Sequence, residues 1–317
     1  MMKKYYLLLI MVAGCMVVRA QQTFRVIGYL RTQNILSAEA NQVDYSRVTH
    51  INIAFINPDS TGNFEQFPNL KVFADKMHKQ HVKVLASIGG GSAPAYYTTL
   101  LSSENRAAFI KKLVSLTEGY HLDGIDVDLE GERVDANYEG FITALSAALK
   151  SKNKLLTAAV ATVYKDRYTD KALGLFDFIS IMSYDKTGPW RPENPGPHAP
   201  YQMAVDDMNY WAGEKGIAKD KLNLGIPFYG YGFGVGAPPD MSFKGIIATY
   251  PGAENVDEVD LPSGGAIYYN GIPTVKNKTQ LALQKAGGIM IWQLLQDATG
   301  ANSLLGTVNT VIKSQSK

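Results

Sequence analysis

Short runs of β-branched and apolar residues alternate with helix-like segments along most of this sequence. Eight runs have the length and composition of strands: 24–30, 48–56, 83–88, 124–130, 155–161, 178–184, 222–229 and 288–294. Between several of them apolar residues recur at helical spacing, as in 104–118 and 138–150. Strand followed by helix, repeated over about 250 residues, predicts an α/β fold, specifically a (β/α)8 TIM barrel, rather than an open doubly wound sheet.

The connections between these runs favour one domain. The chain shows no low-complexity linker and no internal repeat, so residues 21–317 are expected to form a single barrel domain. Residues 87–91 read SIGGG, which lacks the GxGxxG spacing of a dinucleotide-binding turn. Two connections, 185–201 and 230–269, are long, and the second predicts a short insertion between strands 7 and 8. Both follow strands and should lie on the catalytic face.

The composition excludes several classes of function. The 317 residues carry 31 Lys and Arg against 29 Asp and Glu, so there is no basic field for nucleic acid. One cysteine, Cys15, excludes a disulfide framework within the chain and a cysteine-based zinc site. None of the five histidines has metal-ligand spacing to another.

The N-terminus indicates export. Lys3 and Lys4 precede an apolar run over 5–18 that is too short to span a membrane, which predicts a signal peptide over 1–20. Small residues before Gln21 suit an ordinary signal peptidase, whereas residues 12–15, VAGC, resemble a lipobox. The protein is therefore expected to be secreted or periplasmic, with a lipid anchor on Cys15 as the alternative. No later segment is long and apolar enough to span a membrane.

The stretch 122–130, LDGIDVDLE, contains the densest chemistry. In a strand alternate residues share a face, so Asp126, Asp128 and Glu130 point one way and the apolar residues between them point the other. The apolar set would pack on the helices. The acidic set would line the barrel interior, with Glu130 at the mouth where active sites of this fold lie.

Three carboxylates in a poorly solvated interior cannot all ionise freely, because both desolvation and neighbouring negative charge raise the pKa of a carboxyl group. One of them should hold its proton near neutral pH. A protonated carboxyl beside ionised neighbours suits general-acid cleavage of a glycosidic bond, and Glu130 is best placed to reach a substrate.

Other interpretations of this stretch fit less well. A calcium loop starting at Asp126 would need Glu at its twelfth position, where the chain has Asn137, and polar spacers where it has Ile, Val and Leu. A two-metal carboxylate site would recruit histidines. A solvated edge strand with acidic decoration is disfavoured because Gly124 and the apolar residues between the carboxylates suggest burial.

These residues resemble family 18 of the glycoside hydrolases, the chitinase family. Residues 123–130 match its DxxDxDxE signature, 87–90 its SxGG, 182–185 its MxYD, 224–230 its seventh strand and Trp292 the tryptophan that ends its eighth. The matches run in order from Tyr29 to Trp292. Together with the leader, the resemblance indicates a bacterial exported member.

The resemblance implies a retaining, substrate-assisted hydrolysis of β-1,4 bonds in chitin or chito-oligosaccharides. Glu130 would be general acid and base, and the substrate's N-acetyl carbonyl oxygen would be the nucleophile. Asp128 would stabilise the acetamido group, with Asp126 and Asp123 tuning the protonation of Asp128. Tyr184 would donate to the acetamido oxygen.

The resemblance also implies the walls of the sugar site. Substrate contacts would come from the side chains of the MxYD strand, from aromatic residues at the barrel mouth and from the first carboxylate of the signature. These residues are Asp185, Met182, Trp292, Tyr29, Phe55, Trp190 and Asp123.

Three departures from the family pattern affect the expected cleft. Gly91 stands where many members have a tryptophan, and Tyr231 where an arginine often follows the seventh strand. The insertion after that strand is also short. A shallower cleft is therefore expected, which suits endo action or trimming of oligosaccharides.

Two alternative functions stay open. One is an endo-β-N-acetylglucosaminidase acting on the chitobiose core of N-glycans, although the MSYD strand argues against that branch. The other is a chitin-binding lectin without hydrolytic activity, although Glu130 is present. No cofactor or metal is implied, and the expected partner is an N-acetylglucosamine-containing polysaccharide or oligosaccharide bound by a monomer.

Overall fold

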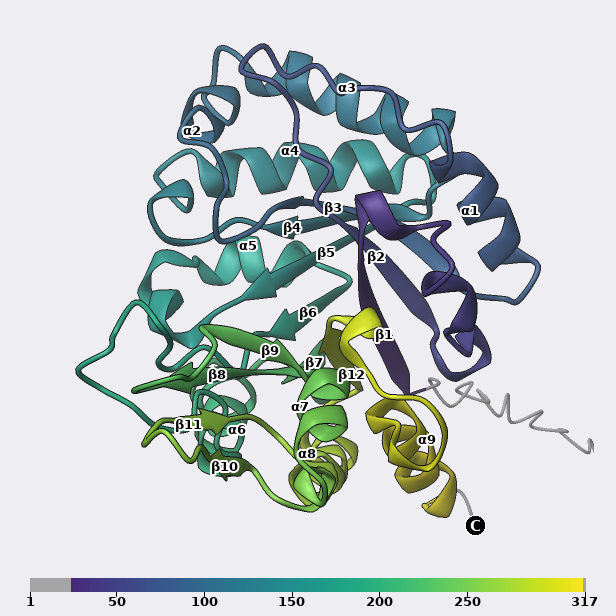
Figure 1. Ribbon diagram of the computed structural model, residues 1–317. Coiled ribbons are helices and arrows are strands. Elements are labelled where there is room, and N and C mark those ends of the chain that lie inside the picture. The colour runs from purple at the N-terminus through teal and green to yellow at the C-terminus, as the bar shows by residue number, and fades with distance from the viewer. Residues whose placement is uncertain (1–23, 316–317) are drawn as a thin grey trace, which may run out of the picture.

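A closed barrel of eight parallel strands forms the centre of the molecule (Figure 1). The computed structural model describes residues 24–315. Around the barrel the strand order is β1-β12-β7-β6-β5-β4-β3-β2. The strands are β1 (Arg25–Arg31), β2 (His50–Ala54), β3 (Lys83–Gly89), β4 (Gly124–Asp128), β5 (Leu155–Val160), β6 (Phe178–Ile181), β7 (Leu222–Pro227) and β12 (Gly288–Trp292). The prediction of a TIM barrel is confirmed.

Helices connect successive strands and lie outside the barrel (Figure 1). They are α1 (Leu70–His78), α2 (Tyr97–Leu100), α3 (Arg106–Gly119), α4 (Tyr138–Lys150), α5 (Asp170–Leu175), α6 (Tyr201–Met208), α8 (Ile272–Lys285) and α9 (Leu304–Ser314). A short π-helical segment, Asn209–Glu214, continues α6. In α3 and α4 the apolar stripes face inward, and the rings of Phe109 and Phe141 stack at 5.8 Å. The two helices predicted from periodicity are present.

The barrel separates two apolar regions. Outward-pointing strand residues, such as Ile125 and Val127 of β4, belong to the large core between strands and helices. A smaller cluster lies inside the barrel and includes Tyr29, Tyr184 and Met290. The alternation expected for β4 is therefore present, because its acidic residues share the inner region with aromatic side chains.

The insertion between the seventh and eighth barrel strands folds into a small α+β unit. Its four antiparallel strands have the order β10-β11-β8-β9. They are β8 (Tyr229–Phe233), β9 (Asp240–Ser242), β10 (Glu258–Asp260) and β11 (Ala266–Tyr268), and α7 (Phe243–Thr249) follows β9. The predicted strand 222–229 thus ends at Pro227, because Tyr229 pairs antiparallel with Ser242 instead of continuing the barrel.

Strand ends differ from the predicted ends by a few residues elsewhere. β4 ends at Asp128 and β6 at Ile181, so Glu130, Tyr184 and Asp185 lie just past the strands, at the carboxyl ends. None of the helices within residues 24–315 has the length and apolarity needed to cross a membrane. The predicted signal peptide and Cys15 fall outside the described residues.

Candidate active site

Strand register places three polar side chains in one row across β3, β4 and β5. Asp126 pairs with Ser87 on one side and with Thr157 on the other. Both hydroxyl groups donate to the Asp126 carboxylate, Ser87 at 2.8 Å and Thr157 at 2.6 Å, and Tyr29 adds a third donor at 2.6 Å. Burial raises the pKa of Asp126, and these three hydrogen bonds oppose the rise.

Asp128 lies two residues further along β4, on the same face, and has no such partners. It is 4% exposed, and its Oδ1 has no hydrogen-bond partner. Burial raises its pKa well above the ordinary value, and the negative charges of Glu130 and Asp126 raise it further. A buried carboxyl oxygen without a partner is ready to bind a polar group of a ligand.

Glu130 follows the strand and lines the main cleft. Burial raises its pKa to about 7, with a further contribution from the negative charge of Asp185. Since that pKa lies near neutrality, Glu130 can donate a proton and later accept one. This is the carboxyl that the sequence singled out as an acid.

Tyr184 and Asp185 approach the carboxylates from the end of β6. Tyr184 is 8% exposed, and its hydroxyl contacts only the weakly accepting Sδ of Met290, at 3.6 Å. The hydroxyl is therefore available to a ligand. Asp185 has a left-handed backbone, with φ of 61°, and its Oδ1 accepts a hydrogen bond from the hydroxyl of Tyr229.

An aromatic floor closes the barrel mouth at β1, β2 and β12. The rings of Phe55 and Trp292 stack with centroids 5.5 Å apart, and Tyr29 tilts against Trp292 at 5.4 Å. Trp292 and Phe55 line the cleft, whereas Tyr29 is buried at 1% exposure and acts through Asp126. A flat ring beside several carboxyls suits a sugar, whose C–H faces pack on aromatic rings.

These side chains share one cleft of about 750 Å³. The loop after β6 forms one wall, where Trp190 is 55% exposed and its ring meets that of Tyr231 edge-on at 5.2 Å. Met182 lines the same cleft. The cleft brings together ten of the eleven residues singled out from the sequence, counting Asp126 and Tyr29, which reach it through hydrogen bonds and ring contacts.

Asp123 is the residue that the structure places elsewhere. It precedes β4, and its carboxylate accepts a hydrogen bond from the N–H of Val84 and lies 2.8 Å from Nε2 of His78. Glu130 lies seven positions further along extended chain, a span of about 23 Å. The expected tuning of Asp128 by Asp123 is therefore not supported by position, since Asp123 lies at the opposite end of the barrel.

Gly91 opens a second hollow beside the acid. A Cβ atom at this position would lie 3.4 Å from Oε1 of Glu130. The hollow has a volume of about 370 Å³ and shares Gly91, Glu130 and Tyr164 with the main cleft. The carboxyl of Glu130 is thus accessible from two sides.

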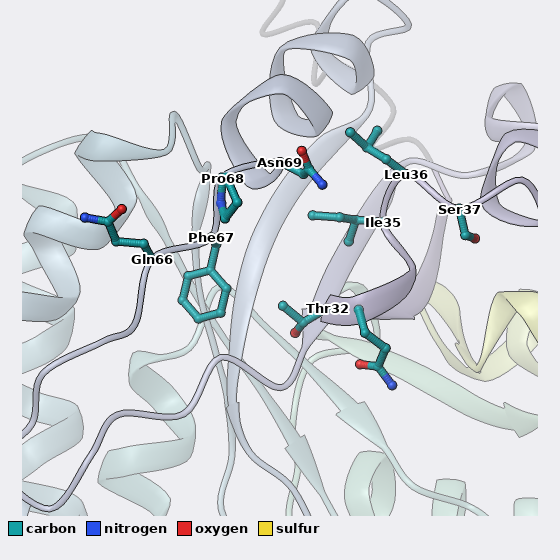
Figure 2. Close-up of a pocket in the computed structure, with 9 residues that line it drawn as sticks. Thr32, Ile35, Leu36, Ser37, Gln66, Phe67, Pro68 and Asn69 are labelled. Atoms are coloured by element: carbon teal, nitrogen blue, oxygen red, sulfur yellow. The ribbon is translucent and has the colours of Figure 1, made fainter.

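A separate hollow of about 360 Å³ lies between the loop that follows β1 and the loop that precedes α1 (Figure 2). Gln66 and Phe67 stand on one side of it, and Ile35 and Leu36 on the other. Its lining contains no titratable side chain. This hollow therefore offers no side chain for acid–base chemistry.

Sequence reasoning missed the supporting residues. Thr157 carries a hydroxyl at an inward position of an otherwise apolar strand. A single polar residue in such a strand could have indicated a hydrogen bond inside the barrel. Ser87 entered only as part of the SxGG match, and the structure shows that its hydroxyl donates to Asp126. No sequence pattern pointed to Asn57. Its side-chain oxygen accepts a hydrogen bond from the N–H of Gly89, and its amide nitrogen donates to the carbonyl of Gly89.

Metal binding has no obvious place in this arrangement. Among residues 24–315, no three His, Cys, Asp or Glu side chains are grouped to hold an ion. The carboxylate of Asp126 accepts hydrogen bonds from three hydroxyl groups, and the cleft above it is lined by aromatic rings, a combination that suits a neutral polar ligand.

Comparison with known proteins agrees with this geometry. Residues 25–297 match the family model described as glycosyl hydrolases family 18. The fold is similar to that of the family 18 chitinase ChiB from the chitin utilization locus of Flavobacterium johnsoniae, with a TM-score of 0.85, 33% identity, and 93% of this chain and 95% of that one covered. A chitinase from Bacteroides thetaiotaomicron has a TM-score of 0.79 at 28% identity, with 93% and 98% covered.

Among curated sequences, a chitinase-like effector of Moniliophthora roreri is 30% identical over 253 residues, which cover 68% of this chain. The chain spans 61% of the length of that relative.

Proposed function

This chain belongs to the glycosyl hydrolases of family 18, and from that premise we propose that it hydrolyses β-1,4 bonds between N-acetylglucosamine units of chitin or chito-oligosaccharides. Two structural relatives, the chitinases from Flavobacterium johnsoniae and Bacteroides thetaiotaomicron, support this substrate class. The observation that carries the proposal is the row on β4, where Glu130, with its pKa raised to about 7, adjoins the buried and unpartnered Oδ1 of Asp128.

In the first step Glu130 donates its proton to the glycosidic oxygen as the bond to C1 breaks. The carbonyl oxygen of the substrate's own acetamido group bonds to C1, which gives an oxazolinium ion and releases the leaving sugar with its new hydroxyl. Asp128 accepts a hydrogen bond from the acetamido N–H as positive charge develops there. The hydroxyl of Tyr184 donates to the acetamido oxygen and so orients it for attack.

In the second step the ionised Glu130 removes a proton from water. As that proton moves, the water oxygen bonds to C1 and the oxazolinium ring opens, which restores the acetamido group; the proton taken from water leaves Glu130 protonated for the next cycle. Two displacements at C1 give a product with retained configuration. Trp292 supports the reacting sugar, and Asp185 contacts it from the β6 side. No cofactor is required for these steps.

We also propose that the protein acts outside the cytoplasm, because residues 1–20 have the composition of a signal peptide. An external enzyme would meet polymeric or partly degraded chitin directly.

The decisive experiment offers the purified protein chitohexaose and a high-mannose glycopeptide side by side. Mass spectrometry follows the products, and NMR records their anomeric form in the first minutes. We expect dimers and trimers from the hexamer with the β-anomer formed first, and an intact glycopeptide.

Two outcomes would contradict the proposal. Cleavage of the glycopeptide alone would assign the protein to the N-glycan-specific activity. Binding of chitohexaose without cleavage would make it a lectin.

A further inference from the structure

His198 is a buried histidine at the base of the loop that follows β6. Its side chain is 0% exposed. Its backbone carbonyl accepts a hydrogen bond from the N–H of Lys186 at 2.9 Å, and this bond joins the two ends of the loop 186–198. Trp190 and Arg191, which line the cleft, lie on this loop. The ring of His198 therefore lies directly behind one wall of the site.

Both ring nitrogens of His198 face oxygen atoms. Nε2 lies 3.2 Å from the backbone carbonyl oxygen of Tyr229, which can only accept. Nδ1 lies 3.4 Å from Oδ1 of Asp185 and makes no hydrogen bond. A neutral imidazole has one N–H, so it satisfies one of these contacts and turns a lone pair toward the other oxygen. An imidazolium has two N–H groups and satisfies both.

The surroundings keep the ring in this place. The rings of Tyr229 and Tyr231 pack against it at 5.0 and 4.8 Å. The neighbouring carbonyl of Ala199 is held by Asn270 at 2.9 Å and by the buried ammonium of Lys278 at 2.8 Å. The backbone of Asp185 is left-handed, with φ of 61°, a conformation that Asp adopts more readily than most residues.

We propose that His198, with a proton on each ring nitrogen, is a positioning residue that orients Asp185 toward the sugar. Oδ1 of Asp185 accepts from both the Tyr229 hydroxyl and Nδ1–H of His198, and these contacts hold the carboxylate at the wall of the cleft, where the substrate would lie. A contact of 3.4 Å is long for a hydrogen bond, and such contacts tighten when a substrate binds. This inference rests on the proposed function, since it gives Asp185 a substrate.

A double-mutant cycle tests the proposal. His198→Gln removes the second N–H, Asp185→Asn removes the carboxylate, and both changes are combined. For chitohexaose we expect His198→Gln to lower kcat/KM about tenfold, the scale of one charge-assisted hydrogen bond. In the Asp185→Asn background the same change should have less than about a twofold effect, because His198 acts through Asp185.

The matched control is Thr187→Val on the same loop. The Thr187 hydroxyl is buried and donates to the carbonyl of Asn194 at 2.7 Å, away from Asp185. Its effect should be equal in both backgrounds. If His198→Gln lowers kcat/KM equally in both backgrounds, it merely supports the loop, and the proposal is overturned. Calorimetric binding constants for chitotetraose complete the same cycle if the protein binds without hydrolysis.

A second measurement needs no variant of His198. In protein labelled with ¹⁵N-histidine at pH 6, the ring is identified by its contacts to the Tyr231 ring, since within residues 24–315 no other histidine ring packs on a tyrosine. We expect two protonated ring nitrogens, free and with chitotetraose bound to Glu130→Gln. A bare Nδ1 in both states would overturn the proposal, whether or not the wild-type protein hydrolyses chitohexaose.

Discussion

At the scale of single residues, the site depends on how the surroundings treat three similar carboxyl groups. Asp126 receives three hydrogen bonds, Asp128 has a buried oxygen with none, and Glu130 stands at the cleft with a pKa raised to about 7. The chemistry of the groups is the same, so burial and hydrogen bonding assign their roles.

Replacing the acid tests its role directly. Glu130→Gln keeps the shape of the side chain and removes the transferable proton. Chito-oligosaccharide binding should change little, while kcat should fall by about 10²- to 10⁴-fold, the usual contribution of a general acid. Calorimetry and initial rates measure the two quantities. The control is Glu132→Gln, an exposed glutamate two residues away that should keep full activity. Equal losses of binding and turnover would make Glu130 structural.

The raised pKa of Glu130 also predicts two pH effects. Activity needs the protonated acid, so kcat/KM should fall as pH rises through about 7. Asp185→Asn removes the negative charge that raises this pKa and should shift the alkaline limb to lower pH. A limb that does not move would contradict the assignment.

The effect on stability has the opposite sign to that of an ion-paired carboxylate. Between pH 4.5 and about 7 the folded protein binds more protons at Glu130 than the unfolded chain does, so stability falls as pH rises through that window. Glu130→Gln should therefore raise Tm at pH 8 and leave it unchanged at pH 4. Calorimetric melting curves at the two pH values measure this difference.

At the scale of elements, the close approach of β3 to β4 brings the site together. Gly89 has φ of 106°, and a Cβ atom there would lie 2.2 Å from the carbonyl oxygen of Asp128. The next residue, Gly90, donates its N–H to the same oxygen at 2.7 Å. Glycine is thus required where the backbone passes behind the catalytic strand.

Gly89→Ala should strain this approach. We expect the free energy of unfolding to fall by about 2 kcal/mol or more, since both the backbone conformation and the available space oppose a side chain. Gly119→Ala is the control, because no atom lies within 4 Å of its Cβ position at the end of α3. Urea unfolding midpoints compare the two variants. Similar midpoints would mean that the strands can separate at no cost.

At the scale of the whole molecule, closure of the barrel gathers loops from distant parts of the chain. β1 pairs with β12, so the aromatic rings of Tyr29 and Trp292 meet although they are far apart in sequence. Loops from several parts of the chain therefore line one cleft, and the insertion after β7 contributes Tyr231 to its wall.

The leader can be tested on the same scale. β1 begins at Arg25, so processing before Gln21 leaves every barrel strand whole. We expect the protein recovered from an exporting host to have the mass of a chain that begins at Gln21. A lipid-modified Cys15 at its N-terminus would instead establish the anchored form, and an unprocessed chain in the cytoplasm would contradict export.

The sequence alone determined the barrel and the face of β4 that carries acid, because strand periodicity is a local property of the chain. The side chains of the cleft mouth followed from the resemblance of its motifs to family 18. The place of each residue along and across the barrel could not be obtained from such local patterns. Asp123 belongs to the same motif as Glu130, yet the length of the strand carries it to the other end. Thr157 and His198 lie in separate segments, and only strand register and loop closure bring them to Asp126 and Asp185. Tertiary structure decided these partners because a pairing between strands or loops is set by the fold as a whole, and the residues that make it carry no common pattern.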